Sequence, residues 1–246
     1  MLYSWHNMVG VLIIVLLCLN VTPLSVSTVE PIYFYASQTG KLTLDRGEGG
    51  GNPFASALVE LLARDNLTFK AFRTELVELT ELKSRKFQRP EVSARADIET
   101  WQLLPKPPAE KRVALVVAFS DYSASGGAFS LPGAKHDLQR VAIALDKAGF
   151  QVQSILDPDL AKLEIALKEF ADRSAASDVA VLYTTGHGVE VEGTIYLLPG
   201  DYPLKQGSAM LKGWAVPLTT MGSALHANRA NLVFYGGCRN NPWGTQ

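Results

Sequence analysis

The sequence predicts an α/β protein with a mostly parallel sheet that carries helices on both faces. Two apolar, β-branched and aromatic runs, in residues 178–188 and 231–242, break into glycine, as fully buried strands of a parallel sheet do. Upstream of them, strand-like runs alternate with helix-like stretches, which indicates crossover units within one parallel sheet. A chain of 246 residues is long enough for one such domain and short for two.

The N-terminus has the composition of a targeting segment. Residues 8–19 form an apolar run that suits a signal-peptide core and is short for a membrane span of about twenty residues. Ser25-Val26-Ser27 offers a cleavage site with small residues, although residues 1–7 lack the usual lysine or arginine. We therefore expect residues 1–27 to be a signal peptide or an N-terminal membrane anchor, and the protein to be exported (periplasmic or secreted) or membrane-tethered.

The next segment predicts one strand and two helices. The strand lies near residues 32–36, and the glycine-rich residues 47–51 after it lack the Gly-Lys-Ser/Thr ending of a phosphate-binding loop, so a flexible loop is predicted. Asn52 is the expected cap of a helix that Pro53 opens. A second amphipathic helix is expected over 69–83. Its predicted core-facing stripe consists of Phe69, Phe72, Leu76, Leu79 and Leu82.

The second half of the chain alternates strands and helices after a Pro-rich, polar stretch at 88–110, which predicts a linker. Asp157 is the expected cap of the helix that begins at Pro158. The expected strands lie at 113–119, 150–155, 178–185, 193–199 and 231–235, and the expected helices at 134–148, 158–174 and 218–228.

Two of these strands end in a reactive side chain. His187 follows one and Cys238 follows the other. Because the carboxyl ends of parallel strands form the working edge of such a sheet, the two residues are expected to meet there. Taken singly, a cysteine is most often a small buried hydrophobe. A thiol beside an imidazole is instead a nucleophile with its acid–base partner, and the shared edge favours that interpretation.

Composition argues against several other classes. The net charge is −1 and no basic stripe is present, so nucleic acid is not an expected partner. The four histidines are too scattered for a zinc-binding pattern, and no cofactor is expected. Of the two cysteines, Cys18 lies in the N-terminal apolar run, which excludes a disulfide framework and leaves Cys238 as a free thiol.

The motifs around the two reactive residues resemble a known family. Tyr183, Gly186, His187 and Gly188, together with the run from Cys238 to Pro242 (Cys-Arg-Asn-Asn-Pro), resemble the caspase-like cysteine peptidases, closest to the bacterial metacaspase and orthocaspase branch. The resemblance implies a caspase-like fold, a dyad of His187 and Cys238, and an oxyanion site formed by the backbone N–H groups of Gly188 and Cys238. That branch is often calcium-responsive, but no dense acidic loop indicates a calcium site here.

The order of the two halves departs from the family. Residues 28–87 resemble the caspase small subunit, which in the family follows the catalytic cysteine, whereas residues 111–246 resemble the large subunit. The reversed order is that of a circular permutation, which exposed and neighbouring termini tolerate. A gene broken between tandem copies and a misassembled reading frame are the alternatives.

The residues expected to set substrate specificity also depart from the family pattern. Gly236 stands where the bacterial branch carries an aspartate that binds a basic P1 side chain, and Leu131 stands where caspases carry an arginine for P1 aspartate. Asp201 is a candidate substitute acid, with a solvated loop position as the alternative. The resemblance also makes Ser37 a candidate substrate-binding residue. We thus expect a cysteine endopeptidase acting on proteins or peptides, with a basic P1 preference if any, or else a catalytically silent caspase-like scaffold.

Overall fold

The computed structural model describes residues 29–47, 49–93, 98–125 and 129–244, so the predicted targeting segment lies outside it. Within these ranges the main sheet has the strand order β3-β1-β11-β7-β5-β6, and every neighbouring pair is parallel except β3 with β1. The architecture confirms the predicted α/β class with a mainly parallel sheet. Its strands are β1 (Ile32–Tyr35), β3 (Glu91–Val92), β5 (Arg112–Ala118), β6 (Gln151–Leu156), β7 (Val179–Thr185) and β11 (Ala230–Tyr235).

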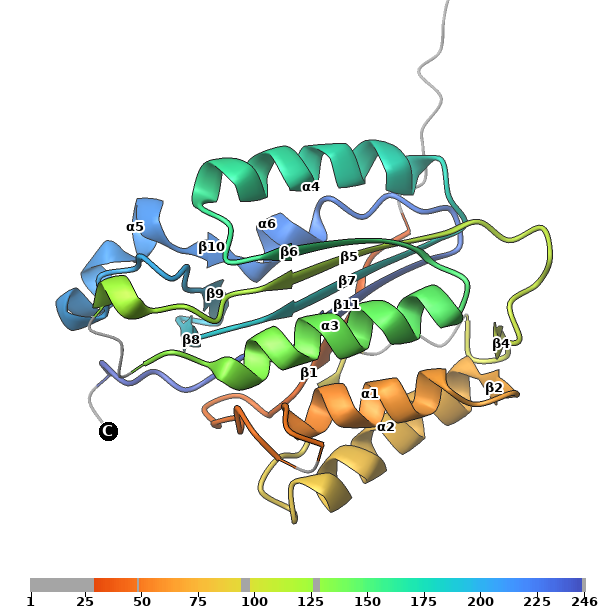
Figure 1. The fold of residues 1–246 in the computed structure, drawn as a ribbon, viewed down its shortest axis with the longest axis horizontal. Helices are drawn as coiled ribbons and strands as arrows, with labels where there is room; N and C mark the ends of the chain where they lie inside the picture. Colours follow the sequence, from red (N-terminus) through yellow and green to blue (C-terminus); the bar gives the residue numbers. More distant parts are fainter. Residues whose placement is uncertain (1–28, 48, 94–97, 126–128, 245–246) are drawn as a thin grey trace, which may run out of the picture.

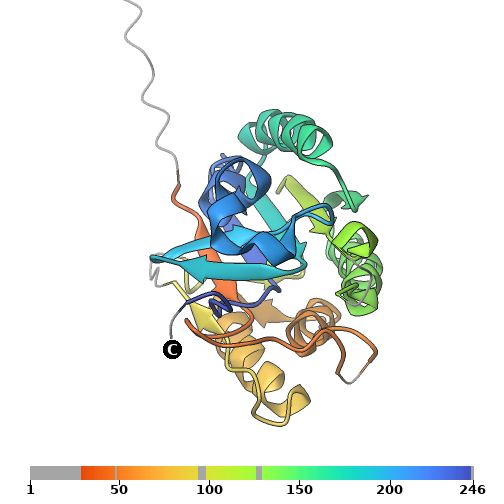
Figure 2. The same ribbon diagram turned by 90° about the vertical axis from the view of Figure 1, so that its left-hand side faces the viewer.

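Helices cover both faces of this sheet (Figures 1 and 2). One face carries α1 (Pro53–Leu62), α2 (Phe69–Lys83) and α3 (Pro132–Lys147), and the other carries α4 (Leu160–Ala175) and α6 (Leu218–Gly222). Because successive side chains of a strand point to opposite faces of the sheet, the buried side chains of each strand divide between two hydrophobic clusters. On β5, Ala114, Val116 and Ala118 belong to the first hydrophobic cluster, whereas Val113, Leu115 and Val117 belong to the second.

The N-terminal segment joins the sheet beside its last strand. Strand β1 pairs with β11 in parallel, with Phe34 opposite Phe234. The rings of these two residues stack with centroids 4.7 Å apart, and Phe72 of α2 meets Phe234 edge-on at 5.9 Å. Segments from the two ends of the sequence thus share one aromatic core.

Both predicted helices of this segment are present. The Asn52 side chain accepts a hydrogen bond of 2.8 Å from the Phe54 N–H, as the expected cap of α1. Helix α2 spans the predicted residues, but Leu82 is 71% exposed, so its assignment to the core was wrong. Thr80 is buried instead, because its hydroxyl donates to the Leu76 carbonyl at 2.7 Å and needs no water.

Two other local predictions require correction. Helix α4 is capped by Asp159, whose side chain accepts from the Lys162 N–H at 2.8 Å. Asp157 has a positive φ of 49° and instead accepts from the Ser120 N–H at 2.6 Å, which fixes the loop after β5. The glycine loop at 47–51 is not simply flexible, since a Cβ on Gly51 would lie 1.9 Å from an Asp137 oxygen on α3.

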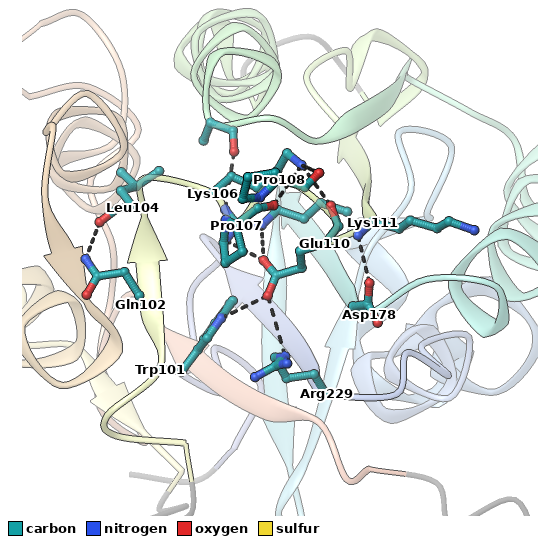
Figure 3. Close-up of polar contacts among 12 residues, drawn as sticks. Trp101, Gln102, Leu104, Lys106, Pro107, Pro108, Glu110, Lys111, Asp178 and Arg229 are labelled. Atoms are coloured by element: carbon teal, nitrogen blue, oxygen red, sulfur yellow. Dashed lines mark hydrogen bonds and ion pairs between the residues drawn. The ribbon is translucent and has the colours of Figure 1, made fainter.

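The segment predicted as a linker contains two short strands. One is β3, and the other is β4 (Gln102–Leu104), which pairs with β2 (Leu67–Thr68). Between β4 and β5 the backbone is held by side chains, as Figure 3 shows: Lys106 Nζ donates to the Glu110 carbonyl at 2.9 Å, and Trp101 Nε1 donates to the Glu110 carboxylate at 3.1 Å. Residues 98–110 therefore pack against the rest of the domain and do not form an open linker.

A small antiparallel sheet lies at the carboxyl end of the main sheet (Figure 1). It has the order β10-β9-β8, and its strand β8 was not predicted separately. The helix predicted at 218–228 is shorter in the structure, where α6 ends at Gly222. Among the described residues, no helix combines the length and hydrophobicity required to cross a bilayer. The remaining elements are β8 (Gly188–Val191), β9 (Thr194–Leu197), β10 (Val216–Pro217), α5 (Leu211–Trp214), and the 3-10 turns η1 (Ser123–Ser125) and η2 (Leu204–Met210).

Candidate active site

The structure brings His187 and Cys238 to one edge of the sheet. Strands β7 and β11 are neighbours, with Thr184 opposite Tyr235 near their carboxyl ends. His187 follows β7 and Cys238 follows β11, and both residues line the same two cavities. Their proximity therefore follows from strand order and register.

The His187 ring is oriented by neutral groups. Its Nε2 lies 2.6 Å from the Phe129 carbonyl oxygen, so this nitrogen carries the proton and Nδ1 remains an acceptor in the neutral ring. The His187 backbone N–H donates to the Tyr122 hydroxyl at 2.9 Å, and that hydroxyl donates to the Leu198 carbonyl at 2.8 Å. Burial lowers the pKa of His187 below its usual 6.5, an effect that the Phe129 carbonyl and the Asp45 charge oppose. The imidazole is therefore suited to act as a base near neutral pH.

The Cys238 sulfur contacts a residue from the N-terminal segment. The Thr43 N–H donates to Sγ at 3.3 Å, and the Thr43 hydroxyl lies 3.3 Å from the same sulfur. The chain there runs beside the cysteine loop, since Gly40 N–H donates to the Arg239 carbonyl and Arg239 N–H donates to the Lys41 carbonyl. Hydrogen bonds from Thr43 can stabilise negative charge on the sulfur. No sequence pattern pointed to this residue.

Arg239 holds these segments in place. Its buried guanidinium pairs with Glu190 of β8 at 2.9 Å and Glu91 of β3 at 2.6 Å, and it lies over the Tyr35 ring at 4.4 Å. It also donates to the Ser37 carbonyl at 3.3 Å. Ser37, the candidate substrate-binding residue, is buried and lines neither of the two cavities.

Tyr235 explains the requirement for glycine at position 188, after β7. Its hydroxyl donates to the Cys238 carbonyl at 3.0 Å, and a Cβ added to Gly188 would lie only 1.6 Å from that hydroxyl oxygen. Gly186 has a positive φ of 150°, which side chains rarely adopt. Among the described residues, no acceptor takes the Cys238 N–H, so it can donate to a bound ligand.

The two cavities share only His187 and Cys238, and they differ in character. The larger, of about 480 Å³, has a mainly apolar lining that includes Phe129, Val189 and Trp243. The smaller, of about 110 Å³, has a mixed lining in which the polar side chains of Asp45, Asn52 and Asp137 stand beside Gly236 and two leucines. Asp201 lines neither cavity and is exposed in the turn after β9, which agrees with the solvated loop position rather than with the pocket acid.

Two carboxylates, one of them paired with an arginine, line the smaller cavity. Asp137 on α3 is fully buried; it accepts from Arg140 Nη2 at 2.7 Å and from the Asn52 N–H at 2.9 Å. Burial raises the pKa of Asp137 to about 7, although these donors act in the opposite direction. Asp45 accepts from the Gly133 and Ala134 N–H groups and so caps α3. A carboxylate on the apolar face of the 134–148 helix was the signal that could have identified Asp137.

The described residues contain no group of three or more His, Cys, Asp or Glu that could hold a metal ion. The reactive groups that line the two cavities are a thiol, an imidazole and two carboxylates. This set can perform nucleophilic attack on a carbonyl with proton transfer.

Comparison with known proteins defines the family. The caspase domain, a peptidase family, matches residues 111–241, which is more than half of the chain. The chain therefore belongs to the caspase-domain family, whose members are cysteine peptidases that act on protein substrates. No curated protein matches the sequence. The matched region ends just beyond the cysteine loop and does not include residues 28–87.

Proposed function

We propose that the protein is a cysteine endopeptidase in which Cys238 is the nucleophile and His187 the acid–base residue. The observation that carries the proposal is that both residues, delivered by neighbouring strands, line the same two cavities. The thiol proton passes to His187 Nδ1 as Sγ attacks the scissile carbonyl, and the backbone N–H groups of Gly188 and Cys238 stabilise the oxyanion. His187 then gives its proton to the leaving amine, and water hydrolyses the thioester.

The smaller cavity supports a basic P1 preference. Asp45 and Asp137 line it beside the nucleophile, so a lysine or arginine side chain entering it would meet carboxylate oxygens. Gly236 stands where the bacterial branch has an aspartate, and the carboxylate of Asp45, from the loop after β1, would replace that charge, with Asp137 of α3 as a second acceptor paired with Arg140. The pocket acid is thus proposed to come from elements other than the Asp201 loop.

We also propose that the two caspase segments occur in permuted order, within the metacaspase and orthocaspase branch that the Cys-Arg-Asn-Asn-Pro motif suggests. Support comes from the parallel pairing of β1 with β11 and from the contact of Thr43 with Cys238. A chain in which residues 93–246 precede residues 28–92, joined by a flexible linker, keeps every packed segment and should then fold and keep its activity. Loss of folding in that rejoined chain would contradict the permutation.

A silent scaffold is the second candidate, since Thr43 lies against the sulfur that must attack substrate. The deciding experiment assays the full chain on fluorogenic peptides with Arg, Lys, Asp or Leu at P1, with and without calcium. We expect cleavage after Arg and Lys that Cys238→Ala abolishes and that Cys18→Ala, which changes the other cysteine, preserves. Equal inactivity of folded wild type and Cys238→Ala on all four peptides would reject the peptidase and favour the scaffold.

A further inference from the structure

The two cavities adjoin at one reactive pair. They share His187 and Cys238 and no other residue, so a peptide whose scissile bond lies at the sulfur has a cavity available on each side of that bond. Peptide cleavage divides the substrate at this point into an acyl part, which stays on the sulfur, and a leaving amine, which takes its proton from the imidazole. The two cavities are thus suited to opposite sides of the scissile bond.

We propose that the larger cavity is the subsite for a bulky apolar side chain directly after the scissile bond, the P1′ residue. The assignment rests on the proposed function, in which the smaller, acidic cavity receives a basic P1 side chain. The enzyme would therefore cut between a basic residue and a large apolar residue, a preference that neither cavity could impose alone.

The chemistry of the lining supports this occupant. The apolar walls are formed by Leu42, Phe129, Val189, Leu198, Leu204 and Trp243. Leu42 is 50% exposed and Phe129 is 43% exposed, although both are large apolar residues. An apolar side chain bound between them would remove this surface from water, at about 25 cal/mol per Å² buried. A volume of about 480 Å³ also lies within the common range of roughly 300–1,000 Å³ for ligand pockets.

Trp243 provides a fixed wall of this subsite. Its ring stacks on Tyr202, with centroids 6.1 Å apart and an interplanar angle of 26°. The Tyr202 hydroxyl donates to the Gly207 carbonyl at 2.7 Å, and the Trp243 N–H donates to Asn241 Oδ1 at 3.0 Å. Lys205, which also lines the cavity, disfavours a basic side chain at P1′. The larger cavity thus disfavours a basic side chain, and the smaller, acidic cavity disfavours an apolar one.

The test uses the full chain and internally quenched peptides that differ only around the scissile bond. Four peptides carry Arg at P1 with Leu, Phe, Ser or Lys at P1′, and a fifth carries the reversed pair, Leu followed by Arg. We expect kcat/KM for Leu and Phe to exceed that for Ser and Lys at least about tenfold, the discrimination that an apolar pocket provides. Equal rates across the four peptides, or preferred cleavage of the reversed pair, would overturn the subsite assignment.

A pair of tryptophan variants tests the wall. Trp243→Ala should reduce the Leu-to-Ser ratio of kcat/KM at least about fivefold, whereas Trp214→Ala, which changes a 41% exposed tryptophan outside both cavities, should leave it unchanged. An unchanged ratio in Trp243→Ala would overturn the role of this wall.

A peptidyl-arginine chloromethyl ketone separates the subsite from the dyad. In this reaction Sγ displaces chloride from the methylene carbon, and the reagent carries no P1′ residue. Its rate of labelling Cys238 should therefore be equal in wild type and Trp243→Ala. Slower labelling in the variant would overturn the subsite role, because Trp243 would then act through the dyad itself. A wild-type protein that is neither labelled nor active would instead reject the proposed function.

Discussion

Glu110, at the amino end of the main sheet, and the two reactive side chains, at its carboxyl end, have opposite kinds of polar partners. At the amino end, Glu110 meets cations and donors. Figure 3 shows its contacts with Trp101 Nε1 at 3.1 Å and Arg229 Nε at 3.5 Å, and Arg112 Nε also donates to it at 2.6 Å. At the carboxyl end, the two reactive side chains contact neutral partners: His187 meets the Phe129 carbonyl, and the Cys238 sulfur meets Thr43.

The difference shows what each end can contribute. A buried charge that is balanced by an opposite charge resists any change in protonation, because removal of either partner leaves the other unpaired in a poor solvent. Burial lowers the pKa of Arg112, and its contacts with Glu110 oppose that shift, which is the pattern of a structural pair. A thiol and an imidazole with neutral partners can instead gain or lose charge during a reaction. We therefore expect substitutions at the amino end to affect stability and those at the carboxyl end to affect activity.

The largest expected effect is on catalysis. His187→Ala removes the acid–base residue and should lower kcat/KM by about 10²–10⁴-fold, while the free energy of unfolding changes little. The matched control is His136→Ala, because His136 also contacts a backbone carbonyl, that of Gly49, but is exposed on α3. Steady-state kinetics and urea denaturation of both variants provide the measurement. A His187→Ala protein with near wild-type kcat/KM would contradict the dyad.

At the amino end of the main sheet, a substitution should instead lower stability and leave activity unchanged. Glu110→Gln leaves the Arg112 guanidinium buried without its counter-charge and should lower the free energy of unfolding by about 3–5 kcal/mol. Activity per folded molecule should not change. Denaturant unfolding measures the loss, with Glu164→Gln on the exposed side of α4 as the control. A loss below about 1 kcal/mol would show that this pair is not needed for stability.

Substitution of Tyr122 should affect both stability and activity. Tyr122→Phe leaves the His187 N–H and the Leu198 carbonyl without their partner and should cost about 1–3 kcal/mol of unfolding free energy. It should also lower kcat, since the imidazole loses part of its support. Tyr196→Phe on β9 controls for the loss of a hydroxyl. Reduced stability with an unchanged kcat would show that Tyr122 does not position His187.

The smallest expected effect is a shift along the pH axis. Burial lowers the pKa of His187 below 6.5, so the folded protein holds the neutral ring at pH values where the unfolded chain binds a proton. This term makes stability fall as pH decreases below 6.5, and the acid limb of kcat/KM should also lie below pH 6.5. NMR titration of the His187 ring, assigned with His187→Ala, measures the midpoint directly. A midpoint at or above 6.5 would contradict the effect of burial.

Much of the fold could be predicted because it depends on short-range patterns. The span of α2 and the Asn52 cap follow from residues within a few positions of one another, and so do the strands that end at His187 and Cys238. The errors arose where a distant contact overrides local preference. Asp157 is drawn away from helix capping by Ser120, 37 residues earlier in the chain.

What the sequence determined by itself is therefore the α/β class, the two catalytic strands and the family motifs that follow them. Only the tertiary structure decided which residues surround the dyad. Thr43 lies 195 residues from Cys238 in the chain, and the Phe129 carbonyl lies 58 residues from His187. Such contacts have no periodicity or spacing along the chain, because they arise from strand order and helix packing. The acidic residues of the smaller cavity were accordingly not predicted, because only the packing of α3 and of the loop after β1 brings Asp137 and Asp45 beside Cys238.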